Sequence, residues 1–203
     1  MSVYNYRILF IRHGETDYNF DGRLQGQRDI PLNGKGREQA SAVGRMLAKT
    51  MRADIDRLDA ASAFHGSPLG RTRMTMELAR AAMGFEPTRY KLDDKLKELT
   101  FGEWEGLSWD DVAARDPEGV LARERDKWGF VPPGGESYAQ LAERIRGWLG
   151  EQSGDLFLTS HGGVARVMMY LLGGVDPDTA ANANIFQGRA LTFEPDWTFR
   201  WIG

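Results

Sequence analysis

The chain of 203 residues contains no cysteine. Composition alone therefore excludes disulfide frameworks, thiolate metal sites and cysteine nucleophiles. Histidine is also scarce, with three residues in the whole chain, which leaves little material for a histidine-rich metal centre. The catalytic chemistry open to the chain is correspondingly narrow.

Long apolar runs and an excess of basic charge are missing too. The most apolar stretch, residues 164–175, is short and contains Arg166, and the N-terminal residues lack the basic and apolar segments of a secretory signal. We therefore expect a cytoplasmic protein without a membrane partner. The formal net charge of −3 gives no general attraction for nucleic acid, although it is compatible with a focused cationic pocket.

The order of apolar segments predicts the class of fold. β-Prone segments at residues 7–11, 61–65 and 156–159 alternate with stretches of helical periodicity, which indicates an α/β fold with a mostly parallel sheet. Residues 190–202 predict a hairpin at the edge of the sheet, with its turn at residues 194–197. The length suits a single domain with a substantial apolar core.

Four helices can be placed from capping residues and periodicity. Asn33 is expected to cap the first, and Ser67-Pro68 to supply the cap and first-turn proline of the second. Ser137 has capping-box spacing before the third, and residues 164–172 form the fourth, which ends at a Gly-Gly pair. The residues expected on buried faces of the first three are Ala40, Val43, Leu47, Met74, Leu78, Ala82, Leu141, Ile145 and Trp148.

Residues 100–135 break this pattern, because they are rich in tryptophan, glycine and charge. We expect a short helix from Ser108 to Arg115 and a loop at residues 131–135. The segment is interpreted as an insertion over one end of the sheet, within a single domain that covers residues 1–203. An ordinary long crossover and a partner-binding surface are the alternatives.

The motif Arg12-His13-Gly14-Glu15 follows the first apolar segment directly. It places an imidazole, which is a candidate nucleophile, beside a permanent cation at the end of a strand, and this pairing suits phosphoryl chemistry. Taken alone, the pair is better explained as a surface arginine next to a half-buried structural histidine. Corroboration must come from elsewhere in the chain.

A second histidine occurs in an equivalent context, because residues 156–160 lead into His161-Gly162-Gly163. Ligands of open α/β sheets bind beyond the carboxyl ends of the strands, so both imidazoles are expected at the same edge. Arg71 lies in the first turn of the helix that follows Ser67, and the N-terminal amides of that helix face this edge. The three elements together predict an anion-binding pocket.

The ordered motifs resemble the histidine phosphatase superfamily, which includes cofactor-dependent phosphoglycerate mutases and related phosphatases. The resemblance covers nearly the whole chain and implies a three-layer α/β/α sandwich with a mostly parallel sheet, like that of phosphoglycerate mutase. The matching stretches are Arg12-His13-Gly14-Glu15-Thr16 with Asn19, Arg23-Leu24-Gln25-Gly26, Asp29-Ile30-Pro31-Leu32 with Gly36 and Gln39-Ala40, Ser67-Pro68-Leu69 with Arg71-Thr72, Glu98 with residues 101–106, residues 133–137, and His161-Gly162-Gly163.

The resemblance also implies the roles of the polar groups. His13 is the nucleophile that forms a phosphohistidine, and Glu98 is the general acid for the leaving group and then the base that activates water. Arg12 and Arg71 complete the catalytic set with His161, a donor to the phosphoryl group that is expected in its protonated form. The residues implied in phosphate binding are Arg12, Asn19, Gln25, Gly26, Arg71, His161 and Gly162.

Other polar groups are assigned no chemistry. His65 is interpreted as structural, since members of the family commonly carry other residues there, and Glu15 and Glu103 are interpreted as local hydrogen-bond anchors. No metal ion or other cofactor is expected, because the arginines and His161 can neutralise the phosphate. Activity should therefore survive a chelator.

The segment that begins at Glu98 has the form Glu-x-x-Phe-Gly-x-Trp-Glu-Gly, which resembles broad-specificity and alpha-ribazole phosphatases more than mutases. With the short insertion, this favours metal-independent hydrolysis of a small phosphate ester by an enzyme of the histidine acid phosphatase type. A phosphoglycerate mutase is the first alternative and a non-catalytic phospho-ligand-binding member the second. The physiological substrate and the oligomeric state stay open, with a homodimer as one option.

Overall fold

A computed structural model describes residues 4–52, 55, 63–196 and 198–203. The described strands form one six-stranded sheet in the order β3-β2-β4-β1-β5-β6. The first four in this order run parallel, whereas β5 pairs antiparallel with β1 and β6 antiparallel with β5, so the predicted mostly parallel sheet is confirmed. The strands are β1 (Ile8–Arg12), β2 (Phe64–Gly66), β3 (Lys91–Leu92), β4 (Leu156–Ser160), β5 (Ala190–Phe193) and β6 (Phe199–Ile202).

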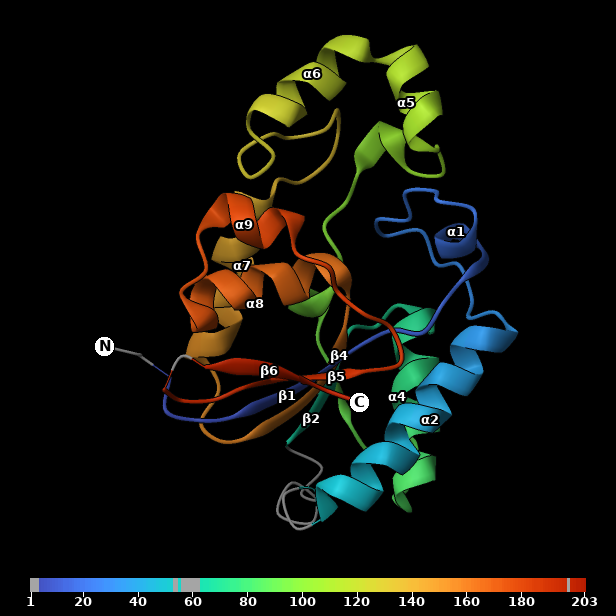
Figure 1. The fold of residues 1–203 in the computed structure, drawn as a ribbon, viewed down its shortest axis with the longest axis vertical. Coiled ribbons are helices and arrows are strands. Elements are labelled where there is room, and N and C mark those ends of the chain that lie inside the picture. The colour runs from blue at the N-terminus through green and yellow to red at the C-terminus, as the bar shows by residue number, and fades with distance from the viewer. Residues whose placement is uncertain (1–3, 53–54, 56–62, 197) are drawn as a thin grey trace.

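Helices cover both faces of the sheet, which gives the three-layer α/β/α sandwich that the resemblance implies (Figure 1). The layer on one face consists of α7 (Tyr138–Gly150) and α8 (Gly162–Gly173), with α9 (Pro177–Asn182) packed on α8. The layer on the other face consists of α2 (Gly34–Thr50) and α4 (Gly70–Met83). No helix in the described part of the chain has the length and apolar character needed to span a bilayer.

The central strand β1 is buried on both faces. Ile8 and Phe10 belong to the core that includes α7 and α8, while Leu9 and Ile11 belong to the core that includes α2 and α4. A strand buried on both faces reads as a continuous apolar run, which is the pattern the sequence carries. Each of these side chains stabilises the fold by about 1.5–3 kcal/mol, so the end of β1 is firmly positioned.

Two of the predicted helix caps are confirmed and one is wrong. The Asn33 side chain accepts the N–H of Gly36, and Ser137 forms a capping box with Gln140. In contrast, α4 begins only at Gly70, after an N-cap residue, Leu69, that makes no side-chain cap. The Ser67 hydroxyl is engaged elsewhere, 2.8 Å from a histidine ring nitrogen, and Pro68 precedes the helix.

The buried face predicted for α4 is also wrong, because Met74 is exposed and Leu78 and Ala82 are only half-buried. Polar residues on the true inner face concealed the pattern. Thr75, for example, donates to the Arg71 carbonyl and accepts the N–H of Gly14. The buried residues of α4 are Arg71, Thr72, Thr75, Met76, Ala79, Arg80 and Met83.

The remaining predicted elements differ only at their ends. α8 begins at Gly162, two residues before the predicted start, and ends at Gly173, followed by the C-cap Gly174, whose φ of 63° is left-handed. The predicted hairpin is confirmed as β5 and β6. Residues 61 and 62 of the predicted second strand and Trp197 of the predicted turn lie outside the described residues.

The segment that replaces the regular pattern contains two helices. α5 (Trp109–Arg115) matches the predicted helix and is capped by Ser108, and α6 (Pro117–Arg125) follows it without having been predicted. Figure 1 draws both helices away from the sheet, on the same side as the short helix α1 (Asp17–Phe20). A small separate core of Leu24, Trp104 and Val112 joins this segment to the loop after α1.

Candidate active site

Strand register brings the two predicted histidines together. β1 pairs with β4 so that Arg12 lies opposite Ser160, and the N–H of His13 donates to the Ser160 carbonyl at 2.9 Å. The rings of His13 and His161 therefore lie side by side at the end of the sheet, with centroids 5.3 Å apart. β2 pairs with the other edge of β4, which brings the Ser67 hydroxyl to 2.8 Å from His161 Nε2.

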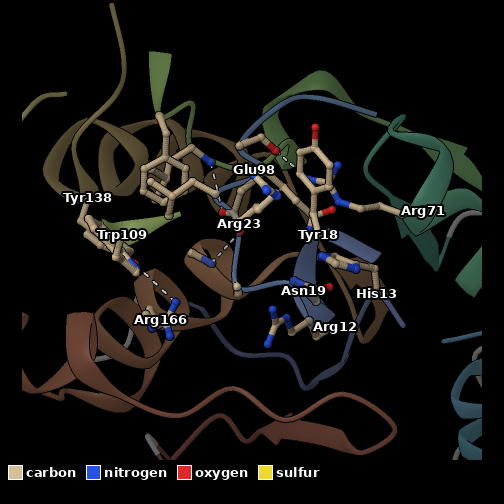
Figure 2. Close-up of a pocket in the computed structure, with 18 of the residues that line it drawn as sticks. Arg12, His13, Tyr18, Asn19, Arg23, Arg71, Glu98, Trp109, Tyr138 and Arg166 are labelled. Atoms are coloured by element: carbon tan, nitrogen blue, oxygen red, sulfur yellow. Dashed lines mark hydrogen bonds between the residues drawn. The ribbon is translucent and has the colours of Figure 1, made fainter. Parts of the chain in front are cut away.

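A cavity of about 320 Å³ opens at this edge of the sheet. It is lined by every residue predicted for the site except His161, whose ring is fully buried. Figure 2 shows how the labelled side chains, which come from β1, α1, α4, α5, α7, α8 and the loops between them, converge on this space. The predicted residues that line it are Arg12, His13, Asn19, Gln25, Gly26, Arg71, Glu98 and Gly162.

The hydrogen bonds of His13 define its tautomer. Nδ1 lies 2.8 Å from the Gly14 carbonyl oxygen, which can only accept, so Nδ1 carries the proton. Burial, followed by the charges of Arg71 and Arg12, lowers the pKa of His13 well below its ordinary value of 6.5. The ring is therefore neutral near pH 7, with a lone pair on Nε2, which is the form that a nucleophile needs.

The environment of His161 favours a neutral ring while the site holds no ligand. Burial lowers its pKa well below 6.5, and the charge of Arg71 adds to the effect. A neutral imidazole still carries one N–H, so it can donate a hydrogen bond. Negative charge from a bound phosphate would favour the cation again, which restricts the expected protonated form to the liganded site.

The two arginines are held by backbone carbonyls. Arg71 donates to the carbonyl of Gly26 at 2.6 Å, and Arg12 donates to the carbonyl of Ile185 at 2.7 Å. The Nε atom of each arginine is buried without a hydrogen-bond partner. A buried donor in this state costs about 1–3 kcal/mol, and a phosphate oxygen would satisfy it. Burial lowers the pKa of Arg12 to about 10, which still leaves it charged at neutral pH.

The amides of Asn19 and Gln25 are oriented by their neighbours. Asn19 Oδ1 accepts from Gln187 Nε2 at 3.0 Å, and Gln25 Oε1 accepts from Thr16 Oγ1 at 2.9 Å. With both oxygens occupied, each amide presents its NH₂ group as a donor. Gln187 also donates to the His13 carbonyl at 3.1 Å, a contact across the fold for which the sequence carries no motif.

Glu98 is held by the start of α8. Its Oε2 accepts the N–H of Gly163 and its Oε1 the N–H of Leu99, each at 3.1 Å. A Cβ atom on Gly163 would lie 2.3 Å from Glu98 Oε1, so this approach requires glycine. The carboxyl group is thereby fixed in the cavity wall, within electrostatic reach of Arg12 and Arg71.

Three residues were predicted to have structural roles, and the structure agrees with that prediction for two of them. His65 packs edge-on against Trp148, and Glu15 accepts from Lys35 at 2.7 Å, which fits the predicted anchor. The Glu103 side chain is exposed, and its neighbour Glu105 is the anchor instead. Glu105 Oε1 accepts from the Gln27 N–H at 2.9 Å and from Thr100 at 2.7 Å. Among the described residues, no three His, Asp or Glu side chains are grouped to hold a metal ion.

The fold and the site define a class of α/β protein with two histidines and an anion-binding cavity at one edge of the sheet. A neutral histidine, two arginines with buried Nε atoms and a carboxyl group meet at the carboxyl ends of the central parallel strands, which is where ligands of such sheets bind. Within that class, the chain belongs to the histidine phosphatase superfamily, branch 1, whose family model matches residues 8–196. The family predicted from the motifs is therefore confirmed.

The chain is similar to known proteins that are named for different activities. A metal-independent phosphoserine phosphatase of Arabidopsis thaliana is 35% identical over 167 residues, 79% of this chain and 66% of the relative. A Salmonella choleraesuis protein named probable phosphoglycerate mutase is 32% identical over 163 residues, 77% of this chain and 69% of the relative. The structure of a mycobacterial glucosyl-3-phosphoglycerate phosphatase complexed with VO₃ has a TM-score of 0.75 and 26% identity, with 97% of this chain and 96% of that chain covered. The chain spans 35% to 69% of the length of the curated relatives it matches, which include the Arabidopsis and Salmonella proteins named above.

Proposed function

We propose that the protein is a metal-independent phosphomonoester hydrolase that works through a phosphohistidine on His13. The observation that carries the proposal is the neutral His13 ring, with Nε2 unprotonated, beside two buried arginine Nε–H groups that have no hydrogen-bond partner. A phosphomonoester brings up to two negative charges, and Arg12 and Arg71 offset them. The relatives that are named phosphatases support hydrolysis.

The first step transfers the phosphoryl group to the enzyme. His13 Nε2 attacks phosphorus, the bond from phosphorus to the ester oxygen breaks, and Glu98 gives its proton to that oxygen as the alcohol departs. Arg12 and Arg71 donate to the phosphoryl oxygens, and the amides of Asn19 and Gln25 add neutral hydrogen bonds. The positive charge that develops on the ring is offset by the phosphoryl group that it now carries.

The second step returns the enzyme to its starting state. Glu98, now ionised, takes a proton from water, and the resulting hydroxide attacks phosphorus while the phosphorus–nitrogen bond breaks. Phosphate leaves and His13 is neutral again. The position of Glu98 suits both steps, because the N–H groups of Leu99 and Gly163 hold its carboxyl group in the cavity wall.

Phosphoglycerate mutation is the second candidate, because one relative carries that name. A mutase keeps the phosphorylated histidine from water and returns the group to the substrate. Incubation with 3-phosphoglycerate and its bisphosphate primer separates the two activities. We expect phosphate release to outrun isomerisation, and the opposite order would favour the mutase.

The direct test of the proposed function compares phosphate release from p-nitrophenyl phosphate by the wild type and by His13→Ala. We expect the substitution to lower kcat by at least about 10³-fold, since it removes the imidazole that forms the covalent intermediate. Arg115→Gln, which changes an exposed residue of α5, is the matched control and should leave kcat unchanged. Retained turnover in His13→Ala would overturn the proposal.

A further inference from the structure

The buried contact between Ser67 and His161 has no part in the two steps described above. Both residues are fully buried, and the Ser67 hydroxyl lies 2.8 Å from Nε2 of the ring. A hydroxyl and a neutral imidazole can each donate or accept, so two arrangements are possible. Either the hydroxyl donates to Nε2 and the ring proton is on Nδ1, or Nε2 carries the proton and donates to the hydroxyl.

The backbone holds both residues in place. The N–H of Ser67 donates to the Thr159 carbonyl at 3.1 Å, next to the last pair of residues between β2 and β4. The Ser67 carbonyl accepts from the Thr72 hydroxyl of α4 at 2.9 Å. His161 is the N-cap residue of α8, and its carbonyl accepts the N–H of Ala165. The sheet and two helices therefore fix the distance between the hydroxyl and the ring.

The hydroxyl proton of Ser67 has a single acceptor within the residues that the structure describes. Besides the imidazole, the group within hydrogen-bond distance of Ser67 Oγ is the N–H of Leu69 at 3.4 Å, and an N–H can only donate. If the hydroxyl also accepted from Nε2, its own proton would be buried without a partner, which costs about 1–3 kcal/mol. The proton is satisfied when the hydroxyl donates to the lone pair of Nε2.

The second ring nitrogen of His161 favours the same arrangement. Nδ1 is buried and has no hydrogen-bond partner in the described part of the chain, as is the case for the Nε atoms of Arg12 and Arg71. An unprotonated Nδ1 would need a donor, which a phosphate dianion cannot supply. A protonated Nδ1 can donate to a phosphoryl oxygen, as the two arginine Nε–H groups can.

The ring of His161 lies beside the phosphate site. Its centroid is 5.3 Å from that of His13, and the next residue, Gly162, lines the cavity. Burial, followed by the charges of Arg71, His13 and Arg12, lowers the pKa of His161 well below 6.5. The ring is therefore neutral at pH 7.5, and one of its two nitrogens carries the proton.

We propose that Ser67 is a positioning residue that holds His161 as the Nδ1–H tautomer, so that the ring can donate a hydrogen bond to the phosphoryl group that His13 receives. The inference rests on the proposed function, because it assigns Ser67 a role in the same reaction. A hydroxyl can also rotate and accept, so the contact persists if a bound phosphate returns His161 to its cation. Nδ1 keeps its proton in both states.

The tautomer is measured by ¹⁵N NMR at pH 7.5 on protein with labelled histidine and without phosphate, with assignments from His13→Gln and His65→Gln. We expect His161 of the wild type to show a pyrrole-type shift for Nδ1 and a pyridine-type shift for Nε2. His13 should show the same pattern, because its Nδ1 donates to the Gly14 carbonyl. A proton on Nε2 of His161 in the wild type would overturn the inference, whatever the activity.

Ser67→Ala then tests the role of the hydroxyl. The Nδ1–H form loses the interaction that favours it, so the Nδ1 resonance of His161 should move toward the pyridine type, while His13 stays unchanged. We expect kcat for p-nitrophenyl phosphate to fall about tenfold or more, because a donor to the phosphoryl group is lost in part of the molecules.

Ser160→Ala is the matched control. It removes a buried hydroxyl from the residue before His161, but that hydroxyl donates to the Leu96 carbonyl at 2.7 Å. The tautomer of His161 should therefore stay as in the wild type. This variant measures the general effect of losing a buried serine hydroxyl next to the site.

The outcomes separate this inference from the proposed function. An unchanged His161 tautomer or an unchanged kcat in Ser67→Ala would overturn the role of Ser67 while the wild type continues to release phosphate. Absence of phosphate release by the wild type would instead overturn the proposed function, and the NMR measurement does not depend on turnover.

Discussion

At the scale of single residues, the site depends on close approaches as much as on reactive groups. Glu98 can reach the amide of Gly163 only because that residue has no side chain. The two buried histidines are neutral because burial and the neighbouring arginines oppose their protonation. Both features lead to measurable expectations.

Gly163→Ala is expected to impair catalysis without unfolding the protein. The added methyl group would lie 2.3 Å from Glu98 Oε1, so the carboxyl group must move away from the α8 amide. We expect a fall in kcat of about 10²-fold or more, because the general acid and base is misplaced. Gly147→Ala, where a Cβ atom would meet nothing within 4 Å, is the control. Unchanged kcat in Gly163→Ala would argue against a catalytic role for Glu98.

The stability of the protein is expected to fall as the pH decreases below about 6.5. The pKa values of His13 and His161 are lowered in the folded state, so below 6.5 the unfolded chain binds protons that the folded chain does not. Each histidine then reduces the free energy of unfolding by about 1.4 kcal/mol per pH unit, until its folded pKa is reached. Urea titrations at pH 7.5 and 5.5 measure the effect.

The matched variant for that measurement is His13→Gln, which should reduce the dependence on pH by about half. A free energy of unfolding that stays constant or rises between pH 7.5 and 5.5 would contradict the neutral state inferred for the histidines. The same result would remove the main support for a nucleophilic Nε2.

The residues of the site could be predicted unevenly from the sequence. His13, Arg12, Arg71 and Glu98 lie in motifs at recognisable positions after strands or before helices, so their convergence follows from the sheet. Gln187 could not be found, because its contacts with His13 and Asn19 cross 174 and 168 residues of chain without a motif. The neutral state of His161 in the unliganded site could not be predicted for a related reason, since burial is a property of the fold.

At the scale of elements, helix positions were predictable where local interactions determine them. The capping box of Ser137 and Gln140 is a local pattern and defines the start of α7. α4 was misplaced because its inner face carries threonines and arginines that bond to other elements, so its apolar pattern indicated the wrong face. α6 was missed because none of its residues is buried.

Ser137→Ala is expected to destabilise the protein by about 1 kcal/mol through α7. The Ser137 hydroxyl accepts the Gln140 N–H at 3.1 Å, and alanine would leave that helix amide without its cap. Urea unfolding at pH 7.5 measures the change, with the exposed Ser153→Ala as control. Equal stability of the two variants would mean that the cap adds nothing to the fold.

At the scale of the whole molecule, the charge that lines the cavity is opposite in sign to the net charge of the chain. The chain is acidic overall, yet cations dominate the cavity at the carboxyl edge of the sheet. Such focusing attracts small anions without attracting polyanions in general. The organisation of residues 1–203 as one domain with an inserted cover is proposed on the same grounds, since α5 and α6 contribute Trp109 and Arg123 to the cavity that the sheet supports.

Activity is expected to be insensitive to metal chelators. Arg12 and Arg71 supply the positive charge that a metal ion would otherwise provide to the phosphoryl oxygens. Phosphate release should therefore be the same within error before and after dialysis against EDTA. Inhibition by EDTA that magnesium or zinc reverses would show that a metal takes part.

The central claim is that the phosphoryl group passes through His13, and trapping that intermediate tests it most directly. The enzyme is mixed with a ³²P-labelled phosphomonoester, quenched within milliseconds to seconds, and the labelled protein is exposed to acid and to base. We predict a label that is lost in acid, retained in base and absent from His13→Ala. A label that is stable in acid and labile in base, or one that persists in His13→Ala, would contradict the phosphohistidine mechanism.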